Sequence, residues 1–420
     1  MILSFVAFSR LQRFSVHYKE FYLSSIQQSS NLDNNGTIRK RNSERIIASM
    51  TRKKTKNQRI SYINKGSIVS DEQLLNDLAH YSVFANAAYG WKMRLLLSGK
   101  LHTGNKKVLI ERTGVEEENI VEANWKAKTH LPAYFIVRDV KRKNIVLCIR
   151  GTLSPRDVLT DLCCIADDFI SKDVIDSFRD KNTALFKKKF LGRAHQGMLQ
   201  SARGIEAAAR TKIAKEFASH PDYNLVIVGH SLGGGVAAIL GTMWKNTFPG
   251  RTVYAYGCPC VGPIDTNPTN DPSIISVVGE GDPFSTLSLG HLADTSRALS
   301  QLCEDEALRS DVLLKTQGDI KDTSKEDLQW CYDTMQKIRI KMKGEKFYPP
   351  GRILYMGGAV FGNKDGEVTL KEVSTEAFEE LLLHPFMFDL SRHVPNRYEY
   401  ALQKLYASNE QIQISKEALQ

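Results

Sequence analysis

Two long segments of the chain repeat apolar residues at the three- and four-residue spacing of an amphipathic helix. Residues 71–97 begin with Asp71, a residue type that caps helix N-termini. Residues 196–217 place six apolar side chains on one helical face, namely Leu199, Ala202, Ile205, Ala209, Ile213 and Phe217. The pattern therefore predicts a helix in each segment.

Short apolar runs elsewhere in the chain predict strands. Residues 134–140 and 145–149 flank a charged turn and are expected to form a hairpin. Four further runs are strand candidates, at residues 224–228, 252–256, 274–278 and 352–356. Helices that alternate with strands of this buried type indicate an α/β fold with a mainly parallel central sheet.

Two stretches break this alternation. Residues 154–193 follow a strand directly and mix charged segments with isolated apolar residues. Residues 300–346 are charged and helical in character. Neither stretch predicts a strand of the sheet, so both are expected to be insertions over one face of it.

Charge is distributed unevenly along the 420 residues. Residues 1–65 contain 13 Lys or Arg and three acidic residues, so they account for the whole formal net charge of +10. This segment has no sustained apolar period, and we expect a disordered basic arm or a targeting segment there, followed by one folded domain over residues 66–420. Because the excess charge is not on a folded face, no nucleic-acid partner is expected.

Apolar runs and cysteines bear on the compartment. No run reaches the roughly 18 to 20 apolar residues of a membrane-spanning helix, so a soluble or peripheral protein is expected. The seven cysteines include no Cys-x-x-Cys pair, which favours a reducing, intracellular environment.

The most informative motif is Gly229-His230-Ser231-Leu232-Gly233. A Gly-x-Ser-x-Gly pentapeptide alone is a weak signal, but here an apolar strand precedes it and an Ala/Ile/Leu-rich helix follows. That context is typical of a nucleophile elbow, in which glycines allow a tight turn around an exposed serine. Ser231 is the candidate nucleophile.

A nucleophilic serine needs a histidine base and an acid that orients it. In α/β-hydrolases the chain order is serine, acid, histidine. Asp282 directly follows a predicted strand, where a triad acid emerges, and Glu280 two residues earlier is the alternative. Of the three histidines after Ser231, His393 is the candidate base, whereas His291 and His384 have structural interpretations.

Several segments resemble the class 3 (fungal-type) lipase family, and within it the diacylglycerol lipase-like branch. They are the motif at Ser231, the Asp282 loop, the His393-Val-Pro segment and the stretches at residues 85–91, 150–162, 195–202 and 348–353, in the same order. The resemblance covers about residues 71–405. It implies an α/β-hydrolase fold, a triad of Ser231, Asp282 and His393, an oxyanion hole from the backbone N–H groups of Thr152 and Leu232, and a lid over residues 154–193.

The chain also departs from that branch. The Asp282 loop lacks the Pro-Arg that usually follows the aspartate, which leaves Glu280 open as the acid, and the N-terminal membrane helices of animal diacylglycerol lipases are missing. Residues 31–42 and 361–372 are spaced like EF-hand loops but are incomplete. No cofactor is expected, and calcium enters only through the family resemblance.

These features predict a carboxylic ester hydrolase that acts on glycerolipids through an acyl-enzyme, with diacylglycerol cleaved to fatty acid and monoacylglycerol. A phospholipase or galactolipase A1 on the same scaffold is the alternative enzyme, and a catalytically silent lipase-like interaction protein is the alternative of another class. The expected partner is glycerolipid at a membrane or droplet surface, with anionic lipid bound by the arm. The expected location is intracellular, in the cytoplasm or peripheral to a membrane, unless residues 1–65 direct import into an organelle.

Overall fold

Apolar side chains alternate between the two faces of the central sheet. In the computed structural model, Val226 and Val228 of strand β7 (Asn224–His230) pack in one core cluster, whereas Leu225 and Ile227 pack in another. Because both faces are buried, the strand is a continuous apolar run rather than an apolar and polar alternation. The sheet therefore lies between two layers of helices.

The structure describes residues 66–91, 104–152, 166–170, 190–261, 271–286, 290, 305–308, 311, 330, 347–358, 367–375 and 390–417. The chain divides into two compact units, and the unit made of Gly66–Leu287, Phe347–Thr375 and Phe388–Gln420 contains the sheet. The basic arm lies outside the described residues, as do most of residues 154–193 and 300–346. The arm, the lid and the helical insertion therefore stay predictions.

The described strands form a nine-stranded sheet in the order β1-β11-β10-β9-β8-β7-β4-β3-β2. The centre is parallel, because β4, β7, β8, β9 and β10 pair parallel with one another, whereas the strands outside them at both edges pair antiparallel. The bounds are β1 Ser67–Ile68, β2 Ile120–Asn124, β3 Tyr134–Asp139, β4 Asn144–Ile149, β8 Thr252–Tyr256, β9 Ile274–Gly279, β10 Arg352–Gly357 and β11 Thr369–Val373. The expected α/β-hydrolase fold is confirmed.

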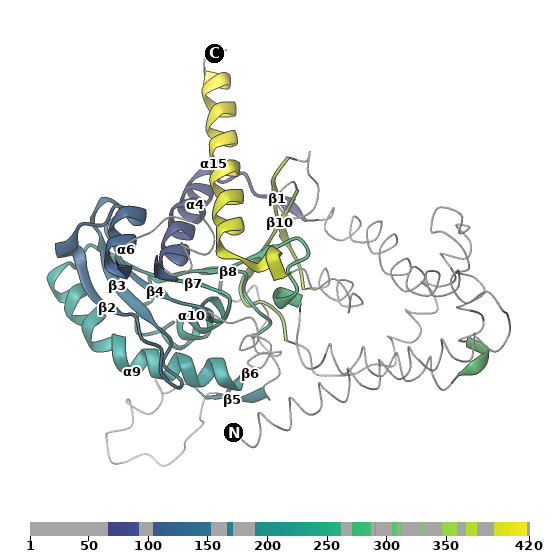
Figure 1. Cartoon of the computed structure of the whole chain (residues 1–420), viewed down its shortest axis with the longest axis horizontal. Helices are drawn as coiled ribbons and strands as arrows, with labels where there is room; N and C mark the ends of the chain where they lie inside the picture. The colour runs from purple at the N-terminus through teal and green to yellow at the C-terminus, as the bar shows by residue number, and fades with distance from the viewer. Residues whose placement is uncertain are drawn as a thin grey trace. The chain divides into compact units, whose positions relative to one another are not determined.

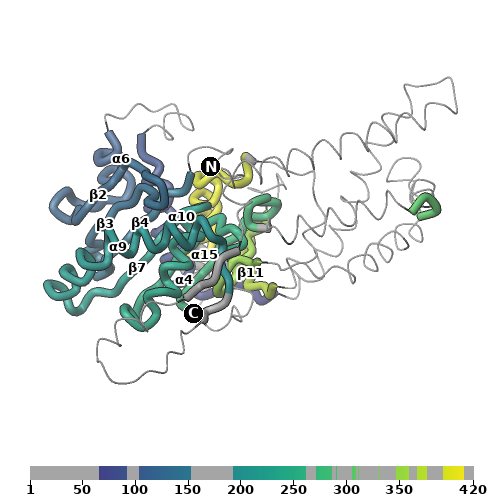
Figure 2. The backbone as a smooth tube through the Cα atoms, turned by 90° about the horizontal axis from the view of Figure 1, so that it is seen from below, coloured from purple at the N-terminus to yellow at the C-terminus, as the bar shows by residue number. Residues whose placement is uncertain are grey.

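The helices cover both faces of this sheet. Figure 1 shows α4 (Glu72–Ala87), α6 (Asn105–Thr113) and α15 (Pro395–Glu417) on one side and α9 (Gln196–Ser219) with α10 (Leu232–Met243) on the other. Figure 2 shows α9 and α10 side by side from a second direction. Among the described residues, no helix combines the length and apolar character that a bilayer crossing requires.

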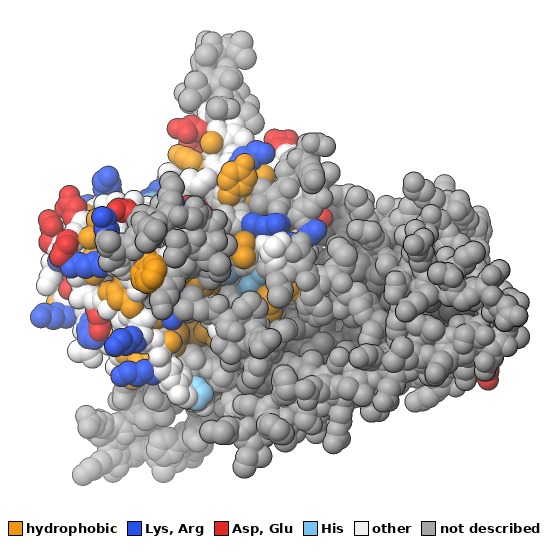
Figure 3. Space-filling model, in the orientation of Figure 1, with side chains coloured by type: hydrophobic (Ala, Val, Ile, Leu, Met, Phe, Trp, Pro, Cys, Tyr) orange, Lys and Arg blue, Asp and Glu red, His pale blue; other side chains and the backbone are white. Residues whose placement is uncertain are grey.

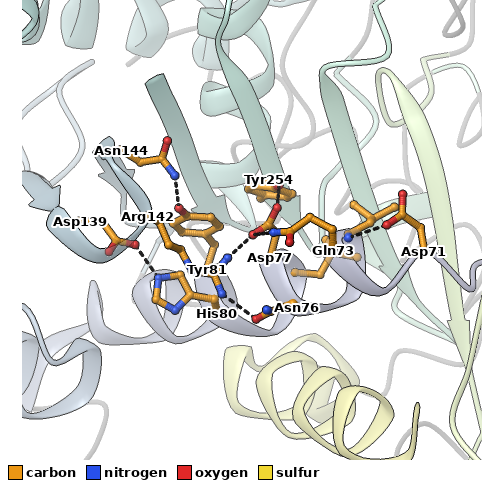
Figure 4. Close-up of polar contacts among 12 residues, drawn as sticks. Asp71, Gln73, Asn76, Asp77, His80, Tyr81, Asp139, Arg142, Asn144 and Tyr254 are labelled. Atoms are coloured by element: carbon orange, nitrogen blue, oxygen red, sulfur yellow. Dashed lines mark hydrogen bonds and ion pairs between the residues drawn. The ribbon is translucent and has the colours of Figure 1, made fainter. Parts of the chain in front are cut away.

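Helix α4 is tied to the sheet by polar contacts, shown in Figure 4. Its N-cap is Asp71, whose side chain accepts from Leu74 N–H at 3.0 Å, as predicted. Further along, Arg142 in the β3–β4 turn donates to Asp77, and Asn144 Nδ2 donates to Tyr81 Oη at 2.7 Å. These contacts fix the helix whose C-terminal end leads to the candidate site.

Most predicted elements are confirmed with small shifts of their ends, except that α4 ends at Ala87 whereas the helix was predicted to reach residue 97. The hairpin is β3–β4, the two long helices are α4 and α9, and the four later strand candidates are β7, β8, β9 and β10. No local pattern predicted α6, β2, β11 or α15, because these elements are short, lie at edges or carry many polar residues.

Residues 154–193 were expected to supply no strand of the central sheet, and their described strands indeed lie outside it. Strands β5 (Ala166–Ile170) and β6 (Phe190–His195) pair antiparallel in a separate two-stranded sheet. Both segments include charged residues, and a ribbon outside the main sheet is not obliged to be apolar on both faces. The buried-strand pattern that found the central strands therefore does not detect it.

Candidate active site

The candidate residues meet at the carboxyl edge of the parallel strands. Ser231 follows β7, Asp282 follows β9, and Gly151 with Thr152 follows β4. His393 ends the short 3-10 helix Leu390–His393, directly before α15. Ligand sites of open α/β sheets lie at this edge because the loops that leave neighbouring parallel strands converge there.

Ser231 occupies a strained turn between β7 and α10. Its φ is 61° and its ψ is −131°, a backbone conformation that residues other than glycine rarely adopt. The turn is so tight that a Cβ on Gly229 would lie 2.2 Å from the carbonyl oxygen of Gly233. The glycines of the motif thus allow α10 to begin at once and hold the serine at the sheet edge.

A chain of hydrogen bonds links three of the predicted residues. Ser231 Oγ lies 2.7 Å from His393 Nε2, and His393 Nδ1 lies 2.7 Å from Asp282 Oδ2. An ionised carboxylate can only accept, so Nδ1 carries the proton and Nε2 is left to accept the serine proton. All three residues are buried, with exposed fractions of 3%, 7% and 1% for Ser231, His393 and Asp282.

The structure distinguishes the two candidate acids by their contacts. Asp282 Oδ1 accepts the backbone N–H of Phe284 at 2.9 Å, while its other oxygen accepts from His393. The Glu280 carboxylate instead accepts from Gly358 N–H at 3.3 Å. The carboxylate brought to the histidine is therefore that of Asp282.

Aromatic rings enclose His393. The Phe284 ring centroid is 4.2 Å away and that of His230 is 4.8 Å away. His230 is itself buried, and its Nδ1 lies 2.8 Å from Tyr89 Oη. Burial, together with neighbouring His393, lowers the pKa of His230 well below its usual range, so this ring is neutral at physiological pH.

Backbone segments flank the serine on the side predicted for the oxyanion hole. A Cβ on Gly151 would lie 3.1 Å from Ser231 Cβ, so the segment that leads to Thr152 passes directly beside the nucleophile. Leu232 is the first residue of α10, and N–H groups in a first helical turn have no partner within the helix. Both predicted N–H groups are thus carried by segments adjacent to Ser231.

Some predicted features lie outside the described residues. These are His291, His384 and the parts of the expected lid other than β5 and β6. Within the described ranges, no group of three or more His, Cys, Asp and Glu side chains is placed to hold a metal ion. Cys258 and Cys260 are both buried thiols there.

Two tyrosines at this site were not predicted from the sequence. Tyr398 on α15 contacts Asp282, and Tyr89, just beyond α4, contacts His230. Tyr398 is five residues after His393, which is the only signal that could have pointed to it. Tyr89 lies in the stretch 85–91 that resembles the class 3 lipases, but nothing in that stretch indicates a contact with His230, which is 141 residues away.

A serine on a strained strand-to-helix turn, hydrogen-bonded through a histidine to a buried carboxylate at the sheet edge, is the arrangement of the serine hydrolases with an α/β-hydrolase fold.

Part of the chain is similar to a known family. Residues 146–290 match the class 3 lipases. The chain is 27% identical over 207 residues to diacylglycerol lipase-beta of Mus musculus, which covers 43% of this chain and 29% of that protein. It is 25% identical over 208 residues to secreted mono- and diacylglycerol lipase 1 of Fusarium solani, covering 49% of this chain and 55% of that protein. Residues 146–290 are thus similar to the class 3 lipase family, and the chain resembles the diacylglycerol lipases.

A second mammalian diacylglycerol lipase and a solved lipase structure also align with part of the chain. Diacylglycerol lipase-alpha of Homo sapiens is 26% identical over 224 residues, which covers 44% of this chain and 20% of that protein. The chain therefore spans between a fifth and three tenths of these mammalian relatives. Among solved structures, the triacylglyceride lipase of Rhizomucor miehei aligns over 79% of this chain and 94% of that one, at 14% identity and a TM-score of 0.41.

Proposed function

We propose that this protein is a serine hydrolase that cleaves glycerolipid carboxylic esters, with diacylglycerol as its substrate and fatty acid and monoacylglycerol as its products. The observation that carries the proposal is the hydrogen-bonded chain from Ser231 through His393 to Asp282. The names of the relatives support the substrate, because mono- and diacylglycerol lipases recur among them.

In the first half of the reaction, Ser231 Oγ attacks the ester carbonyl carbon while His393 Nε2 takes the serine proton. Asp282 stays ionised and stabilises the imidazolium. The carbonyl oxygen becomes an oxyanion, which the backbone N–H groups of Thr152 and Leu232 would stabilise. Collapse of the tetrahedral intermediate breaks the ester bond, and His393 returns the proton to the leaving alcohol, which is monoacylglycerol.

In the second half, water attacks the acyl-enzyme. His393 removes a proton from the water, the oxyanion forms again at the same N–H groups, and fatty acid leaves as Ser231 regains its proton. These steps use only groups of this chain, so we propose that no cofactor is needed. Activity should then survive dialysis against EDTA.

The substrate is insoluble, so we propose that the enzyme works at a membrane or droplet surface inside the cell. On the face shown in Figure 3, Lys and Arg side chains of the described residues are interspersed with Asp and Glu rather than gathered in one patch. Within the described part, this face thus offers no basic footprint of the kind nucleic acid needs. Attraction to anionic lipid would come from the basic arm.

The test is a panel of purified lipids presented to the wild type and to Ser231→Ala. Diacylglycerol should be hydrolysed fastest, and Ser231→Ala should reduce turnover by about 10⁴- to 10⁶-fold, since removal of one triad member disables the unit. Ser82→Ala is the matched control, because Ser82 is also a buried serine but bonds only the Ala79 carbonyl of its own helix.

Two results would overturn the proposal. Retained hydrolysis by Ser231→Ala would remove the serine mechanism. A wild-type protein that neither hydrolyses the panel nor reacts with an active-site fluorophosphonate would instead be the silent interaction protein. Faster cleavage of a phospholipid or galactolipid than of diacylglycerol would keep the mechanism and replace the substrate.

A further inference from the structure

The Tyr398 side chain contacts the candidate triad at Asp282. It lies on the first turns of α15, and its ring is 1% exposed. Its hydroxyl oxygen is 2.5 Å from Asp282 Oδ2, the same oxygen that bonds His393 Nδ1. The proposed mechanism above assigns no part to this side chain.

The direction of this hydrogen bond follows from the second partner of Tyr398. The backbone N–H of Gly279 donates to the tyrosine oxygen at 2.8 Å. A phenol has one proton, and an amide N–H cannot accept it. The Ser285 hydroxyl also contacts Tyr398, but the negatively charged Asp282 carboxylate is the stronger acceptor, so the proton points to Asp282. Burial and the adjacent Asp282 charge raise the pKa of Tyr398 well above its usual range, which keeps that proton on the phenol.

Helix α15 holds the tyrosine in place through contacts with the opposite end of the chain. Asn86 Nδ2 donates to Asn396 Oδ1 at 2.6 Å and to Glu399 Oε2 at 2.5 Å. Arg112 forms an ion pair with Glu399. Residues on either side of Tyr398 are thus anchored, so its hydroxyl is presented to Asp282 in one orientation.

The charged groups near His393 form hydrogen bonds. Asp282 receives three donors, from His393, Tyr398 and the backbone of Phe284. Neighbouring His230 is neutral because of its lowered pKa. Arg392, beside the histidine in sequence, donates to the Glu280 carbonyl oxygen. Among the described contacts, Tyr398 is therefore the only side chain besides the histidine that bonds the aspartate.

We propose that Tyr398 is a positioning residue: its hydroxyl holds the Asp282 carboxylate in the plane that His393 Nδ1 requires and moderates the attraction of that carboxylate for the histidinium. A hydrogen bond to an anion spreads part of its charge onto the donor. Without the hydroxyl, Asp282 would attract the charged form of His393 more strongly, and the histidine would keep its proton to higher pH. The kinetic part of this inference rests on the proposed function.

The test is Tyr398→Phe, read by the pH dependence of kcat/KM and by NMR titration of the His393 ring. The acid limb of the profile and the titration midpoint of His393 should both move up by about half to one pH unit. The kcat on the plateau should fall by less than about tenfold, with KM unchanged, because substrate contacts are untouched.

The matched control is Tyr81→Phe, which removes a hydroxyl from another fully buried tyrosine of the same core cluster, bonded to Asn144 and away from the triad. It should lower the melting temperature without moving the acid limb. Should Tyr398→Phe not fold, 3-fluorotyrosine at position 398 supplies a second test. The more acidic phenol is a stronger donor, so it should move the acid limb to lower pH.

Unmoved His393 titration in a folded Tyr398→Phe, or in the fluorotyrosine protein, would overturn the inference. This outcome is distinct from failure of the proposed function, because the NMR titration does not require turnover. A wild type without esterase activity but with the predicted His393 shift would refute the function and leave the Tyr398 contact standing.

Discussion

Asp282 and Glu280 are two residues apart in one loop, yet only Asp282 bonds His393. We predict that Asp282→Asn reduces kcat by about 10⁴-fold, since the amide cannot orient the correct histidine tautomer. His393→Ala should be about as damaging as Ser231→Ala.

Glu280→Gln should keep activity within about threefold of the wild type, because substitutions that preserve a contact cost little and the amide oxygen can still accept from Gly358 N–H.

Steady-state measurement of kcat for the Asp282→Asn and Glu280→Gln variants decides between the two acids. If Glu280→Gln were inactive while Asp282→Asn turned over normally, Glu280 would be the triad acid, and the observed contact of Asp282 would not be the working one.

His230 makes the stability of the fold sensitive to acid. Its pKa is lowered by burial and by neighbouring His393, so between that value and about 6.5 the unfolded chain binds a proton that the folded chain does not. Stability from this source is complete above about pH 6.5 and is lost as the pH falls below it. His230→Gln should therefore lose less stability than the wild type between pH 7.5 and 5, by up to about 2 kcal/mol.

Melting temperatures of both proteins at the two pH values measure this difference. The pH 7.5 values serve as the reference, because the substitution also changes the contact with Tyr89. Parallel losses of melting temperature on acidification would show that His230 does not contribute.

At the scale of elements, the β7–α10 turn and the segment that follows β4 lie side by side at the candidate site. Residues 154–193 begin directly after the segment that follows β4, and they contain β5 and the start of β6. A segment that mixes charged and large apolar residues beside the site can cover it in water and turn its apolar side to lipid.

We therefore predict interfacial activation. The rate per enzyme with a short-chain ester should rise abruptly where the substrate passes from dissolved monomers to an emulsion, because only an interface takes up the apolar side of an opened lid. Initial rates across the solubility limit measure this, with Ser231→Ala as the blank. A smooth saturation curve through that limit would argue against a lid.

At the scale of the whole molecule, the excess positive charge lies outside the segments that form the sheet. The excess of +10 lies within residues 1–65, whereas the unit that holds the sheet carries both signs interspersed on the face in Figure 3. Arg39-Lys40-Arg41 and Arg52-Lys53-Lys54 with Lys56 form two basic clusters in this arm. Each charge near an anionic leaflet contributes about 1 kcal/mol and is screened by salt.

Replacing these seven basic residues by glutamine in the full chain should weaken binding to vesicles with anionic lipid by at least about 100-fold at low salt. Turnover of a soluble ester should not change, since the triad is untouched. Vesicle co-sedimentation with anionic and neutral vesicles measures the effect. Equal binding of both proteins would eliminate the tether, and a cellular form that begins near residue 65 would favour a targeting segment instead.

The central strands, the two long helices and the elbow at Ser231 can be predicted from the amino-acid sequence. Each of these depends on a local pattern: buried strands are apolar runs, helices repeat at three and four residues, and a tight turn needs glycine. The chain order of the triad also restricted the acid to a strand end and the base to a few histidines.

The carboxylate that contacts His393 and the side chains that surround this histidine could not be predicted, because they depend on how distant segments pack. Glu280 and Asp282 have the same local context, and the outcome depends on how the loop after β9 folds against β10 and α15. Tyr398 bonds Asp282 across 116 residues, and Tyr89 bonds His230 across 141. Such contacts leave no periodic pattern, because they arise where separate elements pack, and packing depends on the whole chain at once.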